Sequence, residues 1–216
     1  MSKKTNKEIL EVAVKLTHSS VAIEGNTLSL KDTWDLLVDG KVSLENQKKM
    51  REIYETKNFY QALMFIFNNR DLTINNHLIL DLHSIIMENI IENNGKFKTN
   101  DNYINGENFL TCPSKLVDSE LSKINLDYQN EISNARDDLT KYYIILKYHV
   151  KFETIHPFSD GNGRTGRLLM TLMMIQNNLD ILYVDYSTKH SYFDLLNKVR
   201  ENENEVEKLF QLLKKV

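Results

Sequence analysis

Glycine and proline, the two residues that most often interrupt helices, are scarce in this chain. Its 216 residues include 7 glycines and 2 prolines. Glycine in a helix costs extra backbone entropy, and proline removes a backbone donor and clashes with the preceding turn. A chain this poor in both is expected to form long helices rather than many short strands joined by turns. The predicted fold class is therefore all-α.

Apolar residues recur at helical spacing along most of the sequence, which supports this prediction. The stripes are carried by Ile9, Val12 and Leu16; by residues 33–38; by Tyr60, Leu63, Met64 and Phe67; by Leu78, Leu82 and Ile85; by residues 116–128; by Leu139, Tyr142, Tyr143, Leu146 and Val150; by Leu168, Leu172 and Ile175; and by residues 192–213. The pattern changes between about residues 95 and 113. There, short β-compatible stretches flank the turn-forming pair Asn105–Gly106. We predict a small hairpin in this segment, with an irregular loop as the alternative.

Charge and cysteine content narrow the class of protein further. The formal net charge is −3, so no basic surplus favours nucleic-acid binding. Cys112 is the one cysteine, which rules out an intrachain disulfide and favours a reducing compartment. No uninterrupted apolar segment resembles a signal peptide or a membrane span. We expect a cytoplasmic protein without nucleic-acid or membrane partners, while injection into a host and homo-oligomerisation stay open.

The segment 156–167, which reads HPFSDGNGRTGR, lies between two strong helical patterns. Pro157 disfavours helical geometry at His156, so one helix should end there. The next helix should begin near Asn162 or Gly163. The first N–H groups of a helix lack partners and carry positive potential, which suits a phosphate chain. The segment is therefore a candidate site for a polyanion.

Side chains in this segment strengthen the case for phosphates. Gly161 and Gly163 let the backbone approach a phosphate and adopt positive φ. Arg164 and Arg167 lie three apart, on one face of the first turn, and each can fork two hydrogen bonds to phosphate oxygens. Asp160 would repel a bare phosphate, but it fits if a divalent cation lies between carboxylate and phosphates.

Two further residues of the segment have simple interpretations. His156 is a candidate base, because a neutral imidazole can take a proton from an attacking hydroxyl near physiological pH. Phe158 is interpreted as an anchor that packs the loop into the core.

Two better-known phosphate and metal motifs do not fit. Residues 161–168 resemble a Walker A loop, but Arg167 replaces its lysine, Leu168 replaces its Ser/Thr, and a helix precedes it. The start of an EF-hand loop also fails, because Arg164 occupies a ligand position and Thr171 replaces the closing glutamate.

The segment matches the signature H-x-F-x-[D/E]-G-N-G-R-x-x-R at every defined position, and on these residues the chain resembles the Fic family over roughly residues 45–213. The resemblance implies a small all-α bundle with a β-hairpin flap over the active site. It also implies the family's usual reaction, in which a Ser, Thr or Tyr hydroxyl of a target protein attacks the α-phosphate of ATP and pyrophosphate leaves.

The resemblance assigns roles to individual residues. His156 would be the general base, and Asp160 would hold Mg²⁺ (or Mn²⁺) on the α- and β-phosphates. The nucleotide would be held by the cradle of Gly161, Asn162 and Gly163, by Arg164 at the β-phosphate and by Arg167 at the γ-phosphate. Residues 95–113 would be the flap that aligns the target by strand-like pairing. Many relatives begin the flap with G-x-Y-R, where this chain has Gly95-Lys96-Phe97-Lys98, so the role of that arginine stays open.

Tyr192 begins a segment that is similar to the family's Y-x-x-x-L stretch near the adenine pocket. A core tyrosine is an equal alternative. Some relatives carry an adenine-reading asparagine further along this helix, where this chain has Arg200. His149 and Glu153, four apart, would form a metal site only with further ligands.

Residues 20–26 resemble the inhibitory motif [S/T]-x-x-x-E-[G/N] of one Fic subclass, through Ser20, Glu24, Gly25 and Asn26. Alone, this pattern would mark a solvated carboxylate before a glycine helix stop. Beside a Fic core, it predicts that Glu24 forms a bidentate pair with Arg167 and withholds that arginine from the γ-phosphate. We therefore divide the chain into an inhibitory helix region, residues 1–40, and a catalytic core, residues 41–216.

The leading function is adenylylation of a target protein docked along the flap near residues 95–113. One alternative is transfer of UMP or a bare phosphate, although the kinase-like relatives carry lysine where this chain has Gly163. A second is removal of AMP, with Glu24 positioning a water. A third is a nucleotide-binding regulatory module with negligible turnover.

Overall fold

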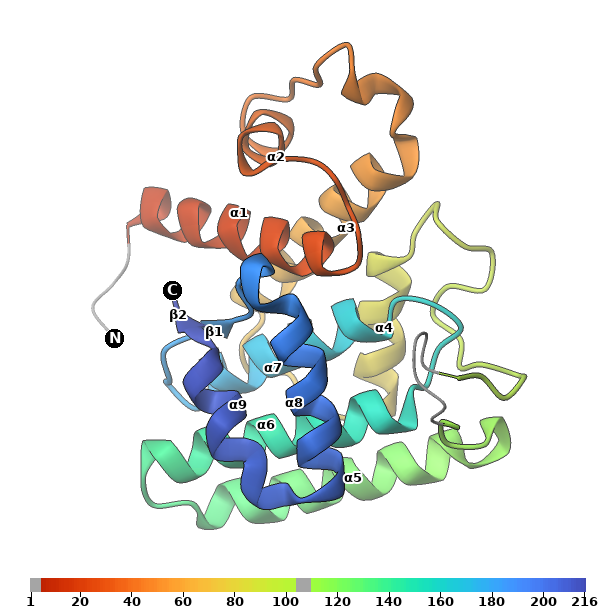
Figure 1. Cartoon of the computed structure of the whole chain (residues 1–216), viewed down its shortest axis with the longest axis vertical. Helices are drawn as coiled ribbons and strands as arrows, with labels where there is room; N and C mark the ends of the chain where they lie inside the picture. The colour runs from red at the N-terminus through yellow and green to blue at the C-terminus, as the bar shows by residue number, and fades with distance from the viewer. Residues whose placement is uncertain (1–4, 104–109) are drawn as a thin grey trace.

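The computed structural model describes residues 5–103 and 110–216, and nearly all of its regular structure is helical (Figure 1). The α-helices are α1 (Asn6–Ile23), α2 (Leu30–Leu37), α3 (Met50–Asn68), α4 (Asn76–Ile86), α5 (Val117–Asn134), α6 (Asp138–Ile155), α7 (Asn162–Gln176), α8 (Lys189–Glu201) and α9 (Val206–Leu212). Short 3-10 turns lie at residues 46–48, 114–116, 186–188 and 203–205. The predicted all-α class is confirmed. Within the described ranges, no helix is long and apolar enough to cross a membrane.

Side-chain caps explain where several helices begin. Thr5 accepts a hydrogen bond from the backbone N–H of Glu8, whose carboxylate accepts from the backbone N–H of Thr5. The same reciprocal capping box joins Ser29 and Asp32 at the start of α2. Asp137 caps α6 through the N–H of Thr140. These caps satisfy donors that have no partner inside the helix.

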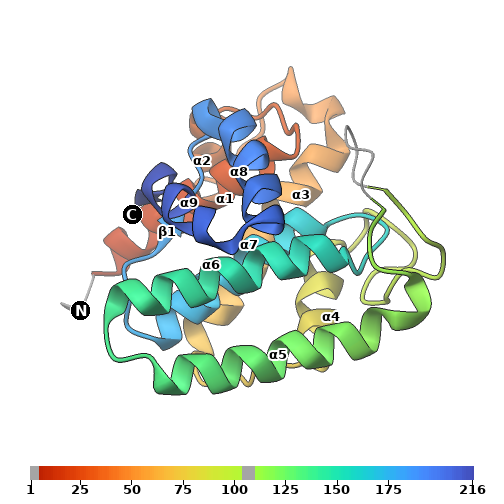
Figure 2. The same ribbon diagram turned by 60° about the horizontal axis from the view of Figure 1, so that its bottom comes forward.

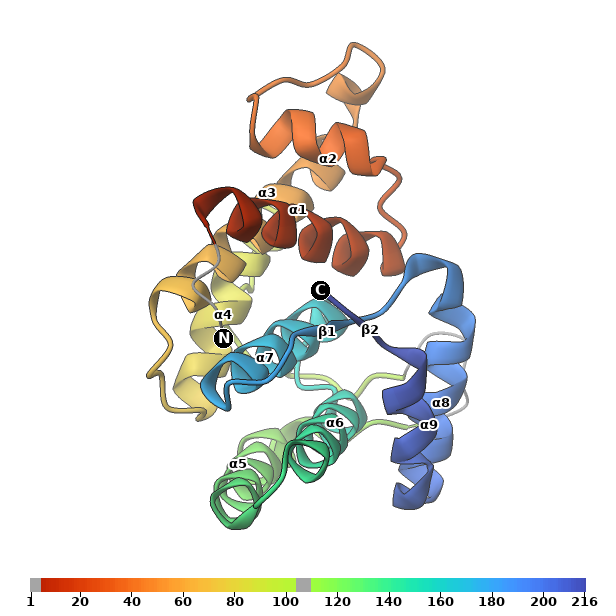
Figure 3. The same cartoon turned by 90° about the vertical axis from the view of Figure 1, so that its left-hand side faces the viewer.

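Helix α7 lies at the centre of the molecule, with the other long helices arranged around it (Figure 3). It packs against α6 on one side and against α1, α3 and α4 on others, and α5 and α6 form a side-by-side pair below it (Figure 2). Its apolar residues are almost fully buried, including the three methionines Met170, Met173 and Met174. The N-terminus of a central helix is thereby enclosed by several elements, and this position builds the site.

Helix α1 belongs to the main hydrophobic core. Ala13, Leu16, Val21 and Ile23 are buried in the same cluster as the side chains of α7. The segment around α2 forms a smaller cluster with α3, made of Leu28, Leu36 and Ile53. The C-terminal end of α1 is consequently fixed against the core, while the division at residue 40 stays a prediction.

The β structure is small. The expected hairpin in residues 95–113 is seen as one antiparallel bridge between Tyr103 and Leu110. The predicted turn Asn105–Gly106 lies outside the described residues. A two-stranded antiparallel sheet lies elsewhere, where β1 (Leu182–Tyr183) pairs with β2 (Lys214–Lys215). This sheet ties the end of the described chain to the segment after α7.

Two details of the helical prediction were wrong. The single helix expected over residues 192–213 is two helices, because the backbone turns extended at Asn202 and its side chain caps a 3-10 turn before α9. Leu139 does not join the buried face of α6 and is 47% exposed. It lies in the first turn of α6.

Candidate active site

The loop between α6 and α7 has the backbone that its sequence predicts. Helix α6 ends at Ile155, and His156 follows in the left-handed region with φ 51°. Helix α7 begins at Asn162, after Gly161 at φ 81°. A Cβ on Gly161 would also lie 2.7 Å from the sulfur of Met87, so this position requires glycine twice over. Gly163, by contrast, lies inside α7 and does not adopt positive φ, so that part of the prediction was wrong.

Asn162 and Phe158 lock the loop. The backbone N–H of Phe158 donates to Oδ1 of Asn162 at 2.8 Å, and Nδ2 of Asn162 donates to the carbonyl of Phe158 at 2.8 Å. The side-chain amide of Asn162 is therefore engaged inside the loop. Its backbone N–H is the group that can donate to a phosphate. The ring of Phe158 is fully buried, as the predicted anchor role requires.

His83 is a loop-supporting residue that the sequence did not reveal. Its ring stacks on Phe158, with centroids 3.6 Å apart. Its Nδ1 accepts from the N–H of Gly95 at 2.9 Å, so the proton must lie on Nε2, which donates to the carbonyl of Asp160 at 3.0 Å. Burial lowers the pKa of His83 to about 4, which keeps this neutral tautomer at neutral pH. An isolated histidine on an apolar helix carries no sequence signal for such a role.

Asp160 is held by two arginines. Its Oδ1 lies 3.0 Å from Nη2 of Arg164, and its Oδ2 lies 2.6 Å from Nη2 of Arg51 on α3. Burial pushes the pKa of Asp160 upward, but Arg164 and Arg51 outweigh it and hold the pKa below its ordinary value. The carboxylate is therefore ionised and partly exposed, as a cation ligand must be. Arg51 has no motif context, and sequence analysis missed it.

Arg164 is buried, with 2% of its side chain exposed. Its Nη1 lies 3.3 Å from Oε1 of Glu55 on α3, a second residue that sequence analysis missed. Within the described residues, Nε and Nη1 of Arg164 make no hydrogen bond. Buried donors without acceptors are costly. Arg164 is thus held at the start of α7 chiefly by its ion pairs with Glu55 and Asp160.

Arg167 points the other way, toward α1. Its Nη2 lies 2.7 Å from Oε1 of Glu24, and it also donates to the backbone carbonyl of Ser20 at 2.9 Å. Its Nε donates to the hydroxyl of Ser20 at 3.0 Å. The expected pair is present, but one oxygen of Glu24 makes it rather than two. Ser20 provides further contacts to Arg167 through both its hydroxyl and its backbone carbonyl.

Three neighbouring features place the carboxylate of Glu24 against the first turn of α7: the turn at Gly25, the anchoring of Asn26 and the absence of a side chain at Gly163. Helix α1 ends at Ile23, and Gly25 follows with φ 103°. Asn26 is buried and ties the turn to α3, donating to the carbonyl of Glu52 at 2.9 Å. A Cβ on Gly163 would lie 2.4 Å from Oε1 of Glu24. Glycine at this position therefore admits the carboxylate to the first turn of α7.

His156 is half-buried beside this cradle. Its Nδ1 lies 3.3 Å from the carbonyl of Glu153. Burial is the main cause that lowers the pKa of His156 to about 4, and the positive charge of Lys98 lowers it further. The imidazole is consequently neutral at neutral pH, the protonation state that a base needs.

Tyr192 and His149 belong to the core behind Arg167. Tyr192 is 1% exposed, and its hydroxyl lies 2.6 Å from Nε2 of His149. This environment favours the core alternative for Tyr192, and a nucleotide contact stays a prediction. No group of three or more metal-binding side chains surrounds His149 and Glu153 within the described part of the chain.

Glu153 gives a prediction for stability. Burial raises the pKa of this carboxyl to about 7, so the folded protein binds a proton that the unfolded chain releases near its ordinary value of 4.5. Stability from this group is therefore lost as pH rises through that window. We expect Glu153→Gln to gain stability over the parent by on the order of 1 kcal/mol per unit between about pH 5 and 7.

Urea unfolding at several pH values would measure this difference. The exposed Glu131→Gln provides the control, for which the difference should stay flat. A Glu153→Gln difference that does not change with pH would contradict the buried, protonated carboxyl.

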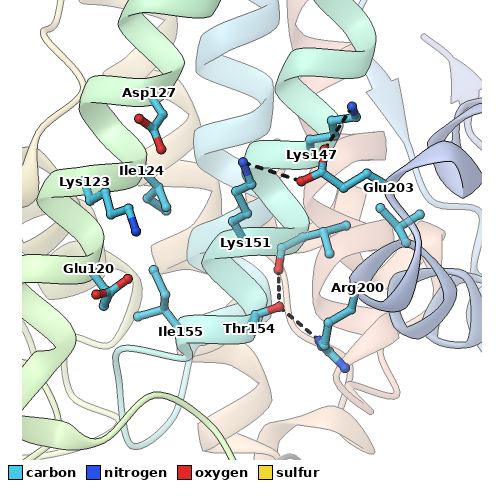
Figure 4. A pocket seen from close by; sticks show the side chains of 12 residues that line it. Glu120, Lys123, Ile124, Asp127, Lys147, Lys151, Thr154, Ile155, Arg200 and Glu203 are labelled. Carbon is cyan, nitrogen blue, oxygen red and sulfur yellow. Dashed lines mark hydrogen bonds and ion pairs between the residues drawn. The ribbon is translucent and has the colours of Figure 1, made fainter.

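A pocket of about 370 Å³ lies between α5, α6 and the turn after α8 (Figure 4). No residue of the 156–167 segment lines it. Its lysines Lys147 and Lys151 both pair with Glu203, at 3.1 and 3.7 Å, and Arg200 donates to the hydroxyl of Thr154 at 3.0 Å. The pocket is therefore separate from the start of α7, where the residues of the 156–167 segment lie.

Comparisons with known proteins agree with this geometry. A sequence model of the Fic/DOC family matches residues 73–174. The chain is 28% identical to "Protein adenylyltransferase Fic" of Aedes aegypti, over 89% of this chain and 38% of that protein. It is 32% identical to "Protein adenylyltransferase fic-1" of Caenorhabditis elegans, over 83% of this chain and 35% of that protein. The chain thus spans little more than a third of the length of these relatives.

Solved structures show the same fold. A Fic domain-containing signalling protein from Bacteroides thetaiotaomicron superposes with a TM-score of 0.78 at 23% identity, covering 88% of this chain and 73% of that one. Fic-1 from Caenorhabditis elegans superposes with a TM-score of 0.77 at 27% identity, covering 96% of this chain and 61% of that one. With the complete signature on residues 156–167, in the loop before α7 and its first turns, these matches show that the chain belongs to the Fic/DOC family.

Proposed function

We propose that this protein transfers AMP from ATP to a Ser, Thr or Tyr hydroxyl of a target protein, and that Glu24 restrains the transfer. The supporting observation is the start of α7, where Gly161 opens the backbone and two buried arginines flank the first turn. The names of the adenylyltransferase relatives support the same reaction. We place the reaction in the cytoplasm, because a single cysteine suits a reducing compartment.

The chain's residues divide the work of such a reaction. Neutral His156 accepts the proton of the attacking hydroxyl. The N–H groups of the first turn of α7 and Arg164 hold the phosphates, so that the α-phosphate stands in line with the hydroxyl. Arg167 contacts the γ-phosphate once Glu24 releases it. Phosphoryl and nucleotidyl transfer depend on such positioning and on charge stabilisation.

Labelled nucleotides test the proposal. Incubating the parent and Glu24→Gly with lysate and ATP labelled at the α-phosphate should label protein bands, whereas the γ-label should not. The γ-label alone on protein would indicate a kinase. A panel of ATP, GTP and UTP would identify the nucleotide, since Arg200 stands where some relatives carry an adenine-reading asparagine. Absence of any label in both variants would leave a nucleotide-binding module.

A divalent cation fits the site only as a companion of the nucleotide. Mg²⁺ usually keeps several waters and is bound by one or two carboxylates plus substrate phosphates. Asp160 provides one partly exposed carboxylate, and the described residues hold no ready-made cluster of three ligands. When bound, the cation would neutralise phosphate charge. Arg51 and Arg164 are the protein cations that it would have to replace at Asp160.

Transfer should therefore stop in excess EDTA and return with Mg²⁺ or Mn²⁺. Asp160→Asn should lower transfer by about 10²-fold, because an amide binds the cation poorly and positioning of the phosphates suffers. Asp81→Asn on the exposed face of α4 is the control and should behave like the parent. Full activity of Glu24→Gly in EDTA would assign Asp160 another role.

A second candidate function is removal of AMP from a modified target. The observation in its favour is that Oε1 of Glu24 lies within the cradle, against Arg167 and Gly163, where it could orient a water. In that case Glu24→Gly would lose de-adenylylation of a pre-modified protein. Both activities can be measured on the same variant.

A further inference from the structure

Lys98 occupies an unusual environment at the start of the flap. The residue is 5% exposed, and lysine is almost never buried without a charged partner. Here its Nζ donates to Oδ1 of Asn102 at 2.7 Å and to the hydroxyl of Thr111 at 2.6 Å. Both acceptors are uncharged. The burial of Lys98 is therefore not explained by an ion pair with these two acceptors.

The third acceptor of Lys98 is the carbonyl of Ile155, at 3.4 Å. Ile155 is the last residue of α6, and the final carbonyls of a helix have no partner inside it. A cation at this end also interacts favourably with the helix dipole. Lys98 thus caps, from a separate segment, the helix that delivers His156.

The flap is tied to the other side of His156 as well. The backbone N–H of Lys98 donates to the carbonyl of Pro157 at 2.8 Å. Nδ2 of Asn102 donates to the carbonyl of Phe158 at 3.1 Å. The carbonyls of Ile155, Pro157 and Phe158, on both sides of His156, therefore each accept a hydrogen bond from the first arm of the flap, residues 95–103.

Thr111 brings in the second arm of the flap, residues 110–113. Its hydroxyl accepts from Lys98 and donates to the backbone carbonyl of Asn102 at 2.8 Å. Its N–H also donates to that carbonyl, at 3.4 Å. The ammonium of Lys98 is the one group among these that contacts both arms and the end of α6.

We propose that Lys98 is a positioning residue that fixes both arms of the flap to the two sides of His156, and so sets where the flap presents an acceptor hydroxyl. The presentation of a hydroxyl rests on the proposed transferase function. The anchoring of the flap does not, and it can be measured by itself.

The charge of Lys98 provides an independent readout. The charged groups that act on His156 are Lys98 on the flap, Glu24 after α1 and Arg200 on α8, and the positive charge of Lys98 lowers the pKa of the imidazole. Lys98→Met should raise the pKa of His156, whereas Lys98→Arg should keep it low. Thr111→Val removes the hydroxyl with little change of shape and leaves the charge in place.

Amide hydrogen exchange on the full chain tests the anchoring. In Lys98→Met, the amides at positions 98 and 111 should exchange at least about tenfold faster, while those of α7 stay protected. Thr111→Val should speed exchange at position 111 in the same direction, and Lys98→Arg should restore much of the protection at both. Thermal unfolding shows that each variant is folded. Unchanged exchange at positions 98 and 111 in a folded Lys98→Met would overturn the proposal.

Transfer kinetics test the positioning. In the Glu24→Gly background, with α-labelled ATP and self-labelling as the readout, Lys98→Met should lower kcat at least about tenfold. The KM for ATP should stay within about twofold, because Lys98 makes no contact with the phosphate cradle. A parent Glu24→Gly that transfers nothing would defeat the proposed function but leave the exchange result intact. Parent-like kcat in Lys98→Met, or an equal loss in ATP affinity, would overturn the positioning role.

Discussion

Glu24→Gly is expected to raise AMP transfer, including self-modification, at least about tenfold over the parent. Nη2 of Arg167 donates to Oε1 of Glu24 at 2.7 Å, and removing the carboxylate makes this N–H available to the γ-phosphate. A charge-assisted contact contributes about 1.5–3 kcal/mol, and a tenfold change in rate needs about 1.4 kcal/mol. The gain is large enough to measure with α-labelled ATP and a denaturing gel.

Arg167→Ala in the Glu24→Gly background should reverse the gain, because the freed guanidinium is the group that acts. Glu11→Gln is a matched control, since Glu11 is an exposed carboxylate on the same helix and should leave the rate unchanged. Ser20→Ala should relieve the proposed inhibition in part, because the hydroxyl that accepts from Nε of Arg167 is lost. Equal rates for Glu24→Gly and the parent would reduce Glu24 to an ordinary helix-end carboxylate.

His156→Ala is expected to lower transfer by about 10²–10⁴-fold, the usual loss when a general base is removed. The structure supports this role in one respect, because burial lowers the pKa of His156 to about 4 and the imidazole is therefore neutral at neutral pH. The measurement is single-turnover transfer in the Glu24→Gly background, so that the proposed inhibition by Glu24 does not mask the effect.

ATP affinity separates this loss from misfolding. Calorimetric titration should show His156→Ala binding ATP within about twofold of the parent, because the ring is not expected to contact the phosphates in the ground state. His77→Ala, on an exposed histidine of α4, should transfer normally. Near-parental transfer by His156→Ala would remove it from the mechanism.

The sequence determined the local part of the site. Pro157 and Gly161 set the break between α6 and α7, because both act on the backbone of neighbouring residues along the chain. The signature from His156 to Arg167 was therefore sufficient to predict the loop between the two helices and the burial of Phe158, while the binding of phosphates there stays a prediction. The scarcity of glycine and proline was sufficient to predict the helical class.

The long-range part of the site was only partly predictable. The pairing of Glu24 with Arg167, 143 residues apart, was expected from a second motif, but the single-oxygen geometry and the part played by Ser20 were not. The contact of Arg51 with Asp160, 109 residues apart, had no motif to announce it. The same is true of His83 under Phe158. The flap motif marked the position of Lys98 but not its contact with the end of α6.

Only the tertiary structure could decide these contacts, because each depends on which helices lie next to α7. An arginine on α3 or a lysine in the flap is compatible with solvent when the sequence alone is considered. Packing places Arg51 beside Asp160 and buries Lys98 beside the end of α6, where unpaired carbonyls and the helix dipole favour a cation. Burial by surrounding elements also gives His156 its low pKa, and no local pattern specifies it.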